Sequence, residues 1–219
     1  MAKPFDHSPL SESVELPLHP GGRAEVVIPH LADARPVTAV KHVALIMSLT
    51  QLQESGYYER YAQLVDPEVL KQVHSGLAMA WSPVELALAH YQACENMMLT
   101  NEQLAALGKV VGTRISETTL VVSAKSREGG ADLWKELDSV HRMWARLNQG
   151  GSAQVSKLGP NEMLLELRGF KLPRFRYYRQ AQVTFICSAF AAAGVRMTSA
   201  RLVRYSEPRD EVSYRFTWE

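Results

Sequence analysis

The chain has 219 residues, of which 46% are hydrophobic and 21% charged, and its formal net charge is +1. This length and composition exclude a mostly disordered chain and suit one domain with a substantial core. The near-neutral charge excludes a global field that attracts nucleic acid or anionic lipid, and no apolar run reaches the roughly 18 residues of a membrane span, so we expect no membrane partner.

Residues 1–22 are rich in Pro, Ser and Gly and show no period, which predicts a flexible tail. Residues 23–219 are expected to form a single α/β domain with a helical part at 36–148 and a sheet part at 151–219. A short strand at 24–29 precedes the helical part. Apolar residues then recur at helical spacing over 39–52.

Three sequence signals indicate helix starts within the helical part. Asp66-Pro67 combines a capping side chain with proline in the first turn. Ser82-x-x-Glu85 and Thr100-x-x-Gln103 have the spacing of capping boxes. A further helix is predicted from about residue 131 to residue 147, and the sequence NQGG at 148–151 ends it.

The last third changes to the period of strands. AQVSKL and MLLELR flank the turn-forming tetrapeptide GPNE at 159–162, which predicts a hairpin. A helix from about 173 to 193 follows, and two strands close the chain. In the last strand Val212, Tyr214, Phe216 and Trp218 alternate with polar residues and are predicted to face inward. The expected fold class is α+β, with a β-β-α-β-β antiparallel sheet packed against helices.

Several motifs carry a resemblance that covers roughly residues 38–219. The stretches AWSPVELALAHYQA, AALGKVVG, NQGGSAQV, LELRGF and SYRFTW resemble an uncharacterised family of paralogous myxobacterial proteins. That family is similar in layout to vinyl-reductase-like ligand domains and to haem nitric-oxide-binding domains. The resemblance implies a helix-then-sheet domain that senses a ligand.

The haem domains of that wider group carry a Tyr-x-Ser-x-Arg motif for the propionates and a proximal histidine. The matching stretch here is Leu164-x-Glu166-x-Arg168, in which only the arginine remains. A second stretch, from Tyr205 to Arg209, has glutamate in place of the serine. We therefore predict no cofactor, and haem binding is not expected.

One constellation suggests a ligand site. His90 and Cys94 are four residues apart, so they share a helix face, and Trp81 stands near the predicted start of that helix. The pair could ligate a metal or haem. The alternative is a structural role, with a buried cysteine beside a half-buried histidine, because two candidate ligands alone do not make a metal site. We predict no metal site and name the three residues as candidate ligand contacts.

The stretch RGFKLPRFRYYRQ, residues 168–180, contains five positive and four aromatic side chains and no acid. It is a candidate contact for an anion, a protein partner or single-stranded nucleic acid. Alternatively, it joins a strand to an amphipathic helix, and its arginines lie along aromatic surface. Our candidate binding residues are Arg168, Lys171, Arg174, Arg176, Tyr177 and Arg179. Nucleic acid is the less favoured partner, because the net charge is close to zero.

No GxSxG, P-loop, HExxH or GxGxxG motif is present, so no catalytic residue is assigned. Cys94 and Cys187 are the only cysteines, which is typical of a protein from a reducing cytoplasm. The favoured function is a cytoplasmic, non-catalytic binding or signalling module, dimeric or bound to a protein partner, with a possible small-molecule ligand. The alternative is an enzyme with a dispersed active site that uses His90, His141 or Cys94.

Overall fold

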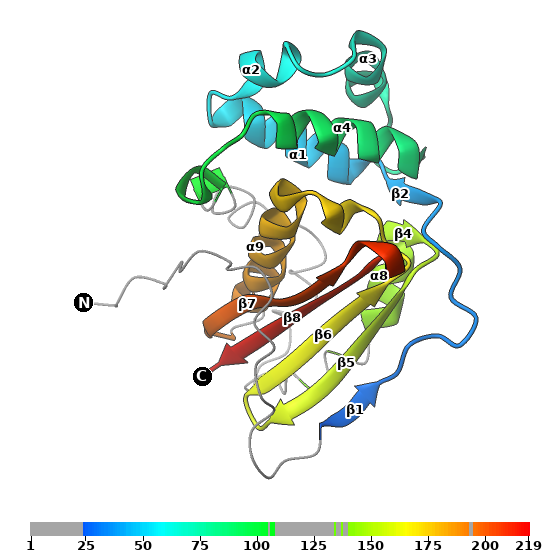
Figure 1. The fold of residues 1–219 in the computed structure, drawn as a ribbon, viewed down its shortest axis with the longest axis vertical. Coiled ribbons are helices and arrows are strands. Elements are labelled where there is room, and N and C mark those ends of the chain that lie inside the picture. Colours follow the sequence, from blue (N-terminus) through cyan, green and yellow to red (C-terminus); the bar gives the residue numbers. More distant parts are fainter. Residues whose placement is uncertain (1–23, 105, 108–133, 135–136, 138–139, 193–194) are drawn as a thin grey trace.

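The computed structural model describes residues 24–104, 106–107, 134, 137, 140–192 and 195–219. The fold is α+β, as predicted: helices dominate the first part of the chain, and an antiparallel sheet with one long helix forms the last part (Figure 1). The predicted tail at 1–22 lies outside the described residues, as does part of the predicted helix at 131–147. The end of that helix is confirmed, because Val140–Leu147 is helical. No helix among the described residues is long and apolar enough to cross a membrane.

Among the described residues, the larger sheet has five antiparallel strands in the order β1-β5-β6-β8-β7. Its strands are β1 (Glu25–Ile28), β5 (Ser152–Gly159), β6 (Glu162–Arg168), β7 (Met197–Ser206) and β8 (Glu211–Trp218). The predicted hairpin is confirmed, since β5 pairs with β6 and Val155 lies opposite Leu165. The inward face of β8 is confirmed as well, because Tyr214 and Phe216 are completely buried.

One face of this sheet is covered by helices. The helix α9 (Arg176–Ala192) follows the short 3-10 helix η1 (Leu172–Arg174), and α8 (Val140–Leu147) precedes β4 (Asn148–Gln149). Val183 on α9 and Leu137 pack against Val155, Leu165 and Phe216 in one hydrophobic core. The alternation of apolar residues along β6 and β8 produces this arrangement, because every second side chain points toward the helices.

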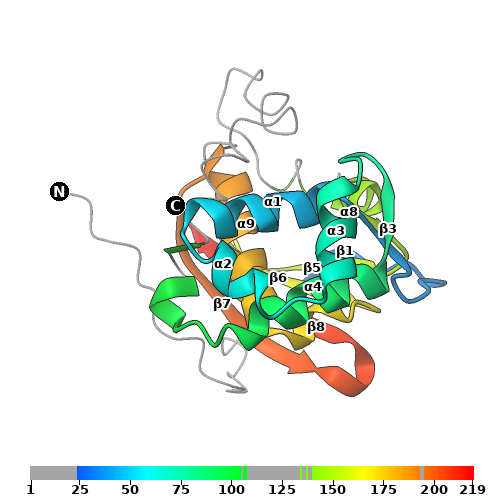
Figure 2. The ribbon, with the colours of Figure 1, turned by 90° about the horizontal axis from the view of Figure 1, so that it is seen from above.

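The helical part forms a separate layer above the sheet (Figure 1), and Figure 2 shows this layer from above. It contains α1 (Val43–Glu54), α2 (Tyr58–Ala62), α3 (Pro67–Ser75) and α4 (Val84–Asn96). Two of its predicted helix starts are confirmed. Asp66 accepts a hydrogen bond from Glu68 N at 2.8 Å. Thr100 Oγ1 accepts one from Gln103 N at 3.2 Å, and Gln103 Oε1 accepts one from Thr100 N at 2.8 Å.

The prediction that residues 36–148 are almost entirely helical is wrong at three short strands. β2 (Ala39–Lys41), β3 (Trp81–Pro83) and β4 form a second antiparallel sheet in the order β3-β2-β4. The predicted capping box at Ser82 is wrong for the same reason. Ser82 lies within β3, and its buried hydroxyl bonds Nδ1 of His42 at 2.7 Å instead of a helix N–H. Pairing with β2 therefore overrides the local capping signal.

Candidate functional site

A continuous series of aromatic rings joins the two layers. Trp144 on α8 contacts Phe170, whose ring centroid is 5.2 Å away, and Phe170 contacts Tyr178 on α9 at 5.5 Å. Tyr178 meets Tyr91 on α4 edge to face at 4.9 Å, and Tyr91 lies 6.2 Å from Tyr177. Trp144 packs against both hydrophobic cores. The junction between the helical layer and the sheet layer is thus built from rings that α4, α8, α9 and the connection between β6 and η1 supply.

A polar cluster lies beside these rings, inside the helical core. His90 is completely buried; its Nδ1 lies 2.7 Å from the Tyr61 hydroxyl and its Nε2 lies 2.9 Å from Ser48 Oγ. The Cys94 Sγ is 3.7 Å from the same Nε2, so His90 and Cys94 share one helix face, as their spacing indicates. Burial, with a smaller contribution from the neighbouring His42, lowers the pKa of His90 to about 3. The ring is therefore neutral at physiological pH.

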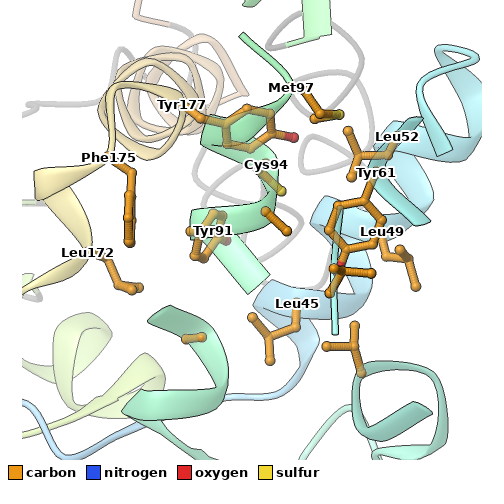
Figure 3. Packing of buried hydrophobic residues seen from close by; sticks show 14 of the residues in the cluster. Leu45, Leu49, Leu52, Tyr61, Tyr91, Cys94, Met97, Leu172, Phe175 and Tyr177 are labelled. Atoms are coloured by element: carbon orange, nitrogen blue, oxygen red, sulfur yellow. The ribbon is translucent and has the colours of Figure 1, made fainter. Parts of the chain in front are cut away.

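The Tyr177 hydroxyl lies at the edge of this cluster, beside Ser48 and Cys94, and neither these nor any other described residue gives it a hydrogen bond of good geometry. Its side chain is 3% exposed, and Figure 3 shows the hydroxyl directed toward Cys94 and Met97. Burial raises the pKa of Tyr177 and of the Cys94 thiol well above their ordinary values. Phenol, thiol and imidazole are therefore all neutral here, which suits a neutral occupant and excludes a nucleophilic thiolate at Cys94.

Tyr61 and Ser48 were not predicted from the sequence. Tyr61 lies on the short helix α2 and Ser48 on α1, and only the packing of α1, α2 and α4 brings them to His90. Trp81 lies apart from this cluster: it is on β3, which directly precedes α4, it is 37% exposed, and Lys41 Nζ stands 3.9 Å from its ring centroid. The structure thus brings His90 and Cys94 together and leaves Trp81 apart from them.

Two arginines of the basic stretch have acidic partners from distant parts of the chain. Arg168 Nε is 3.0 Å from Glu211 Oε1. Arg176 lies 3.9 Å from Glu95, donates to Asn101 Oδ1 at 3.1 Å, and also donates to the Leu99 carbonyl. Both side chains therefore connect elements of the fold, although the stretch itself contains no acid.

The remaining candidates of the basic stretch differ in their surroundings. Arg179 Nη1 donates to the carbonyls of Pro173 at 2.7 Å and Arg174 at 3.1 Å, so it ties α9 to η1. Arg174 lies over the ring of Phe175, with 4.8 Å between guanidinium and centroid. Lys171 is exposed, whereas Tyr177 is buried. The exposed part of this stretch is consequently limited to Lys171 and the outer parts of the arginines.

Two further histidines lie near the start of β5. His141 on α8 donates from Nε2 to the carbonyl of Ala153 at 2.7 Å. Nδ1 of His30 lies 3.0 Å from Ser152 Oγ, and its Nε2 has no partner among the described residues. Burial lowers the pKa of His30 to about 4, with a smaller contribution from Arg168. No group of three His, Cys, Asp or Glu in the described part of the chain could hold a metal ion.

Solved structures of H-NOX domains share this fold. A Fe(II) unliganded H-NOX protein from K. algicida superposes with a TM-score of 0.55 and 9% identity, over 82% of this chain and 96% of that chain. A structure from work on heme distortion in the H-NOX family superposes with a TM-score of 0.52 and 12% identity, over 81% of this chain and 95% of that chain. An oxygen-binding H-NOX domain related to soluble guanylate cyclases superposes with a TM-score of 0.51 and 12% identity, over 82% of this chain and 95% of that chain. The chain has an H-NOX-like fold.

No family model matches the sequence, and no curated protein matches it. The similarity at 9–12% identity shows the fold alone. It nevertheless contradicts the prediction that no cofactor is needed and that haem is not expected, because the H-NOX structures include Fe(II) and heme proteins. That prediction rested on the missing Tyr and Ser at Leu164 and Glu166, and a short motif was too narrow a basis for judging a site built by the whole fold.

Proposed function

We propose that this chain is a ligand-binding sensory domain whose ligand meets the junction between the helical layer and α9. The Tyr177 hydroxyl carries this proposal. A buried hydroxyl without a partner costs about 1–3 kcal/mol, so a native protein seldom keeps one unless another group satisfies it. A ligand that exchanges a hydrogen bond with Tyr177 removes that cost, and the H-NOX-like fold supports the same function.

The position of Tyr177 suits signal transmission. Tyr177 is the second residue of α9, Cys94 belongs to α4 and Ser48 to α1. A ligand beside these residues would contact the helical layer and the main helix of the sheet layer together. Its presence would therefore favour one packing of α9 against α4, which is the differential interaction that a sensor requires.

Haem is the cofactor that we propose to test first, because the neighbouring folds include heme proteins, and its candidate ligand lies on α8 rather than beside Tyr177. Among the described histidines, His141 has the most suitable surroundings. Its Nε2–H donates to the Ala153 carbonyl, which leaves the lone pair of Nδ1, and a backbone carbonyl is a usual support of a metal-binding imidazole. His90 uses both ring nitrogens. When bound, haem supplies an iron that can hold a diatomic gas.

In this proposal His141 would hold the iron, and the Ala153 carbonyl would fix its tautomer. Arg168 is the residue left from the propionate motif, and its ion pair with Glu211 would have to be shared with a carboxylate of the cofactor. The similarity to the myxobacterial paralogous family belongs to the same proposal of ligand sensing.

Titration of the purified chain with haemin, followed by visible absorption, tests the cofactor. We expect an intense haem band that shifts when carbon monoxide is added, and we expect His141→Ala to lose or change that band. His74→Ala is the matched control, because His74 is exposed and bonds only Tyr58 at 3.0 Å among the described residues. A spectrum unaltered by His141→Ala rejects His141 as the iron ligand, and the absence of any bound haem rejects haem.

Tyr177→Phe tests the ligand contact itself. In protein that has been unfolded and refolded without small molecules, this substitution should not lower the free energy of unfolding, because the hydroxyl has no hydrogen bond of good geometry to lose among the described residues. Tyr214→Phe is the control: Tyr214 is equally buried but donates to Gln182 Oε1 at 3.2 Å, so its loss should cost about 1 kcal/mol. Equal losses in the two variants would show that Tyr177 already has a partner and would remove the proposal's main support.

A further inference from the structure

The segment between α3 and α4 exposes an unusual amount of apolar surface. Leu77 is 77% exposed, Met79 75% and Trp81 37%. Ala78, Ala80 and Pro83 are exposed as well. This apolar segment, residues 77–83, is continuous in sequence and lies at the periphery of the molecule (Figure 2). Exposed apolar side chains are ordinary when scattered, but a contiguous group of them indicates an interaction surface.

The same segment contains a free strand edge. β3 pairs with β2 on one side and is the outermost strand of its sheet among the described residues. The carbonyl of Ala80 accepts from His42 N at 3.0 Å, and Val84 N donates to Thr38 O at 2.9 Å. Bonding groups alternate along an antiparallel strand, so residues 80, 82 and 84 face β2. Trp81 and Pro83 consequently turn their backbone groups toward the open edge.

Opposite charges lie at the two ends of this edge. The Lys41 ammonium donates to the Met79 carbonyl at 2.8 Å and covers the ring of Trp81. Glu85 is exposed in the first turn of α4, just beyond Pro83. The edge therefore has a cation at the Met79 end and an acid at the Glu85 end.

We propose that this edge binds a second copy of the chain through antiparallel pairing of β3 with β3. With Ser82 at the two-fold axis, Trp81 of each copy lies opposite Pro83 of the other, and Trp81 N–H donates to that Pro83 carbonyl. The Met79 end of each copy then lies beside the Glu85 end of the other. Lys41 and Glu85 thus meet twice across the axis, which is the self-complementarity that a two-fold interface requires.

The proline limits this pairing. Pro83 has no N–H, so the paired strands exchange two hydrogen bonds, one from each Trp81. A longer edge would invite open-ended strand addition, whereas a three-residue strand that ends in proline is a usual protection against it. Backbone pairing therefore sets the register, and burial of Leu77, Met79 and Trp81 contributes most of the affinity. A generic apolar peptide would use the same edge but would not need both Lys41 and Glu85.

Sedimentation equilibrium over a range of concentrations tests the proposal. The wild-type chain should dimerise reversibly, and Trp81→Glu should raise the dimer dissociation constant at least about tenfold, because it puts two acids into the apolar contact. Glu85→Lys should raise it as well, by placing like charges opposite each other. The double variant Lys41→Glu, Glu85→Lys should return it to within about threefold of wild type. Leu64→Ser, which removes a 42% exposed side chain outside the apolar segment, is the control.

Amide hydrogen exchange supplies a second measurement. The Trp81 N–H should exchange more slowly in the dimer than in the monomeric variants, whose folding is checked by circular dichroism. A wild-type chain that is monomeric at its highest soluble concentration would overturn the inference. So would a dimer that Trp81→Glu and Glu85→Lys leave unchanged. This inference does not rest on the proposed ligand, so haemin binding and dimerisation are measured separately.

Discussion

The Tyr61 hydroxyl and Nδ1 of His90 lie 2.7 Å apart, and this contact connects the short helix α2 to the centre of α4. Both side chains are completely buried. The ring of His90 also meets Tyr61 edge to face, with 5.2 Å between centroids. A five-residue helix has little stability of its own, so this contact is a main anchor of α2.

Tyr61→Phe should therefore lower the free energy of unfolding by about 1–3 kcal/mol, since it leaves a buried imidazole nitrogen without a partner. Chemical denaturation measures the change. Tyr58→Phe is the matched control from the same helix: its hydroxyl bonds the exposed His74, and its removal should cost less than about 0.5 kcal/mol. A smaller effect at Tyr61 than at Tyr58 would contradict the anchoring role.

Gly76→Ala should be strongly destabilising. A Cβ at this position would lie 2.1 Å from His42 Nε2, and His42 is fixed because Nε2 donates to the Val73 carbonyl at 3.0 Å. The clash should cost at least about 2 kcal/mol, measured by thermal or chemical unfolding. Gly159→Ala is the control, since its Cβ would meet Glu162 Cβ at 3.7 Å, an ordinary contact. Similar losses at the two glycines would show that His42 moves freely.

Stability should fall as the pH is lowered below about 6.5. The pKa of His90 is about 3 in the folded protein and about 6.5 in the unfolded chain, so between these values only the unfolded chain binds the proton. This contribution is fully present above pH 6.5 and is lost toward pH 3, at up to about 1.4 kcal/mol per pH unit. His30, whose pKa is lowered to about 4, acts in the same direction.

Unfolding free energies measured between about pH 5 and 6.5 test this dependence, because ordinary carboxylates titrate below that window. His90→Gln should reduce the slope of unfolding free energy against pH, whatever its effect on absolute stability. Gln92→Ala, on the same helix and with a bond to Asn96, should leave the slope unchanged. Identical slopes in wild type and His90→Gln would show that His90 does not titrate as its burial requires.

The arginines of the basic stretch should differ in their contribution to stability. Arg176→Ala removes bonds to Asn101 and Leu99 and the ion pair with Glu95, and we expect a loss of about 1–2 kcal/mol, reduced by the partial exposure of the side chain. Arg174→Ala should cost about 0.5 kcal/mol or less, because it removes a cation–π contact at the surface. Equal losses in chemical denaturation would show that Arg176 does not tie α9 to the helical layer.

The sequence predicted the secondary structure correctly wherever the pattern that indicates it lay within one short segment. The alternation from Val212 to Trp218 predicted both the strand and its buried face, because a period of two needs no partner to be visible. Asp66 and Thr100 predicted helix starts for the same reason: a cap bonds residues two or three positions along the chain. The hairpin at Gly159 was also local.

The features that the sequence did not predict depend on contacts between residues far apart in the chain. A three-residue strand such as β3 shows no period, and its pairing with β2 joins residues about 40 positions apart. Ser82 has a perfect local capping pattern, yet its hydroxyl bonds His42. At the site, the spacing of His90 and Cys94 was visible in the sequence, but Tyr61 and Ser48 reach His90 only through helix packing.

The two most N-terminal strands of the described residues, β1 and β2, pair with segments that are synthesised much later. β1 pairs with β5, where Glu25 lies opposite Lys157, and β2 pairs with β4, where Val40 lies opposite Asn148. During synthesis these N-terminal strands therefore remain without those partners until well over half of the chain has been made. Long-range pairing of this kind slows folding and exposes strand edges meanwhile. A nascent chain of this protein should thus need protection against aggregation until β5 has left the ribosome.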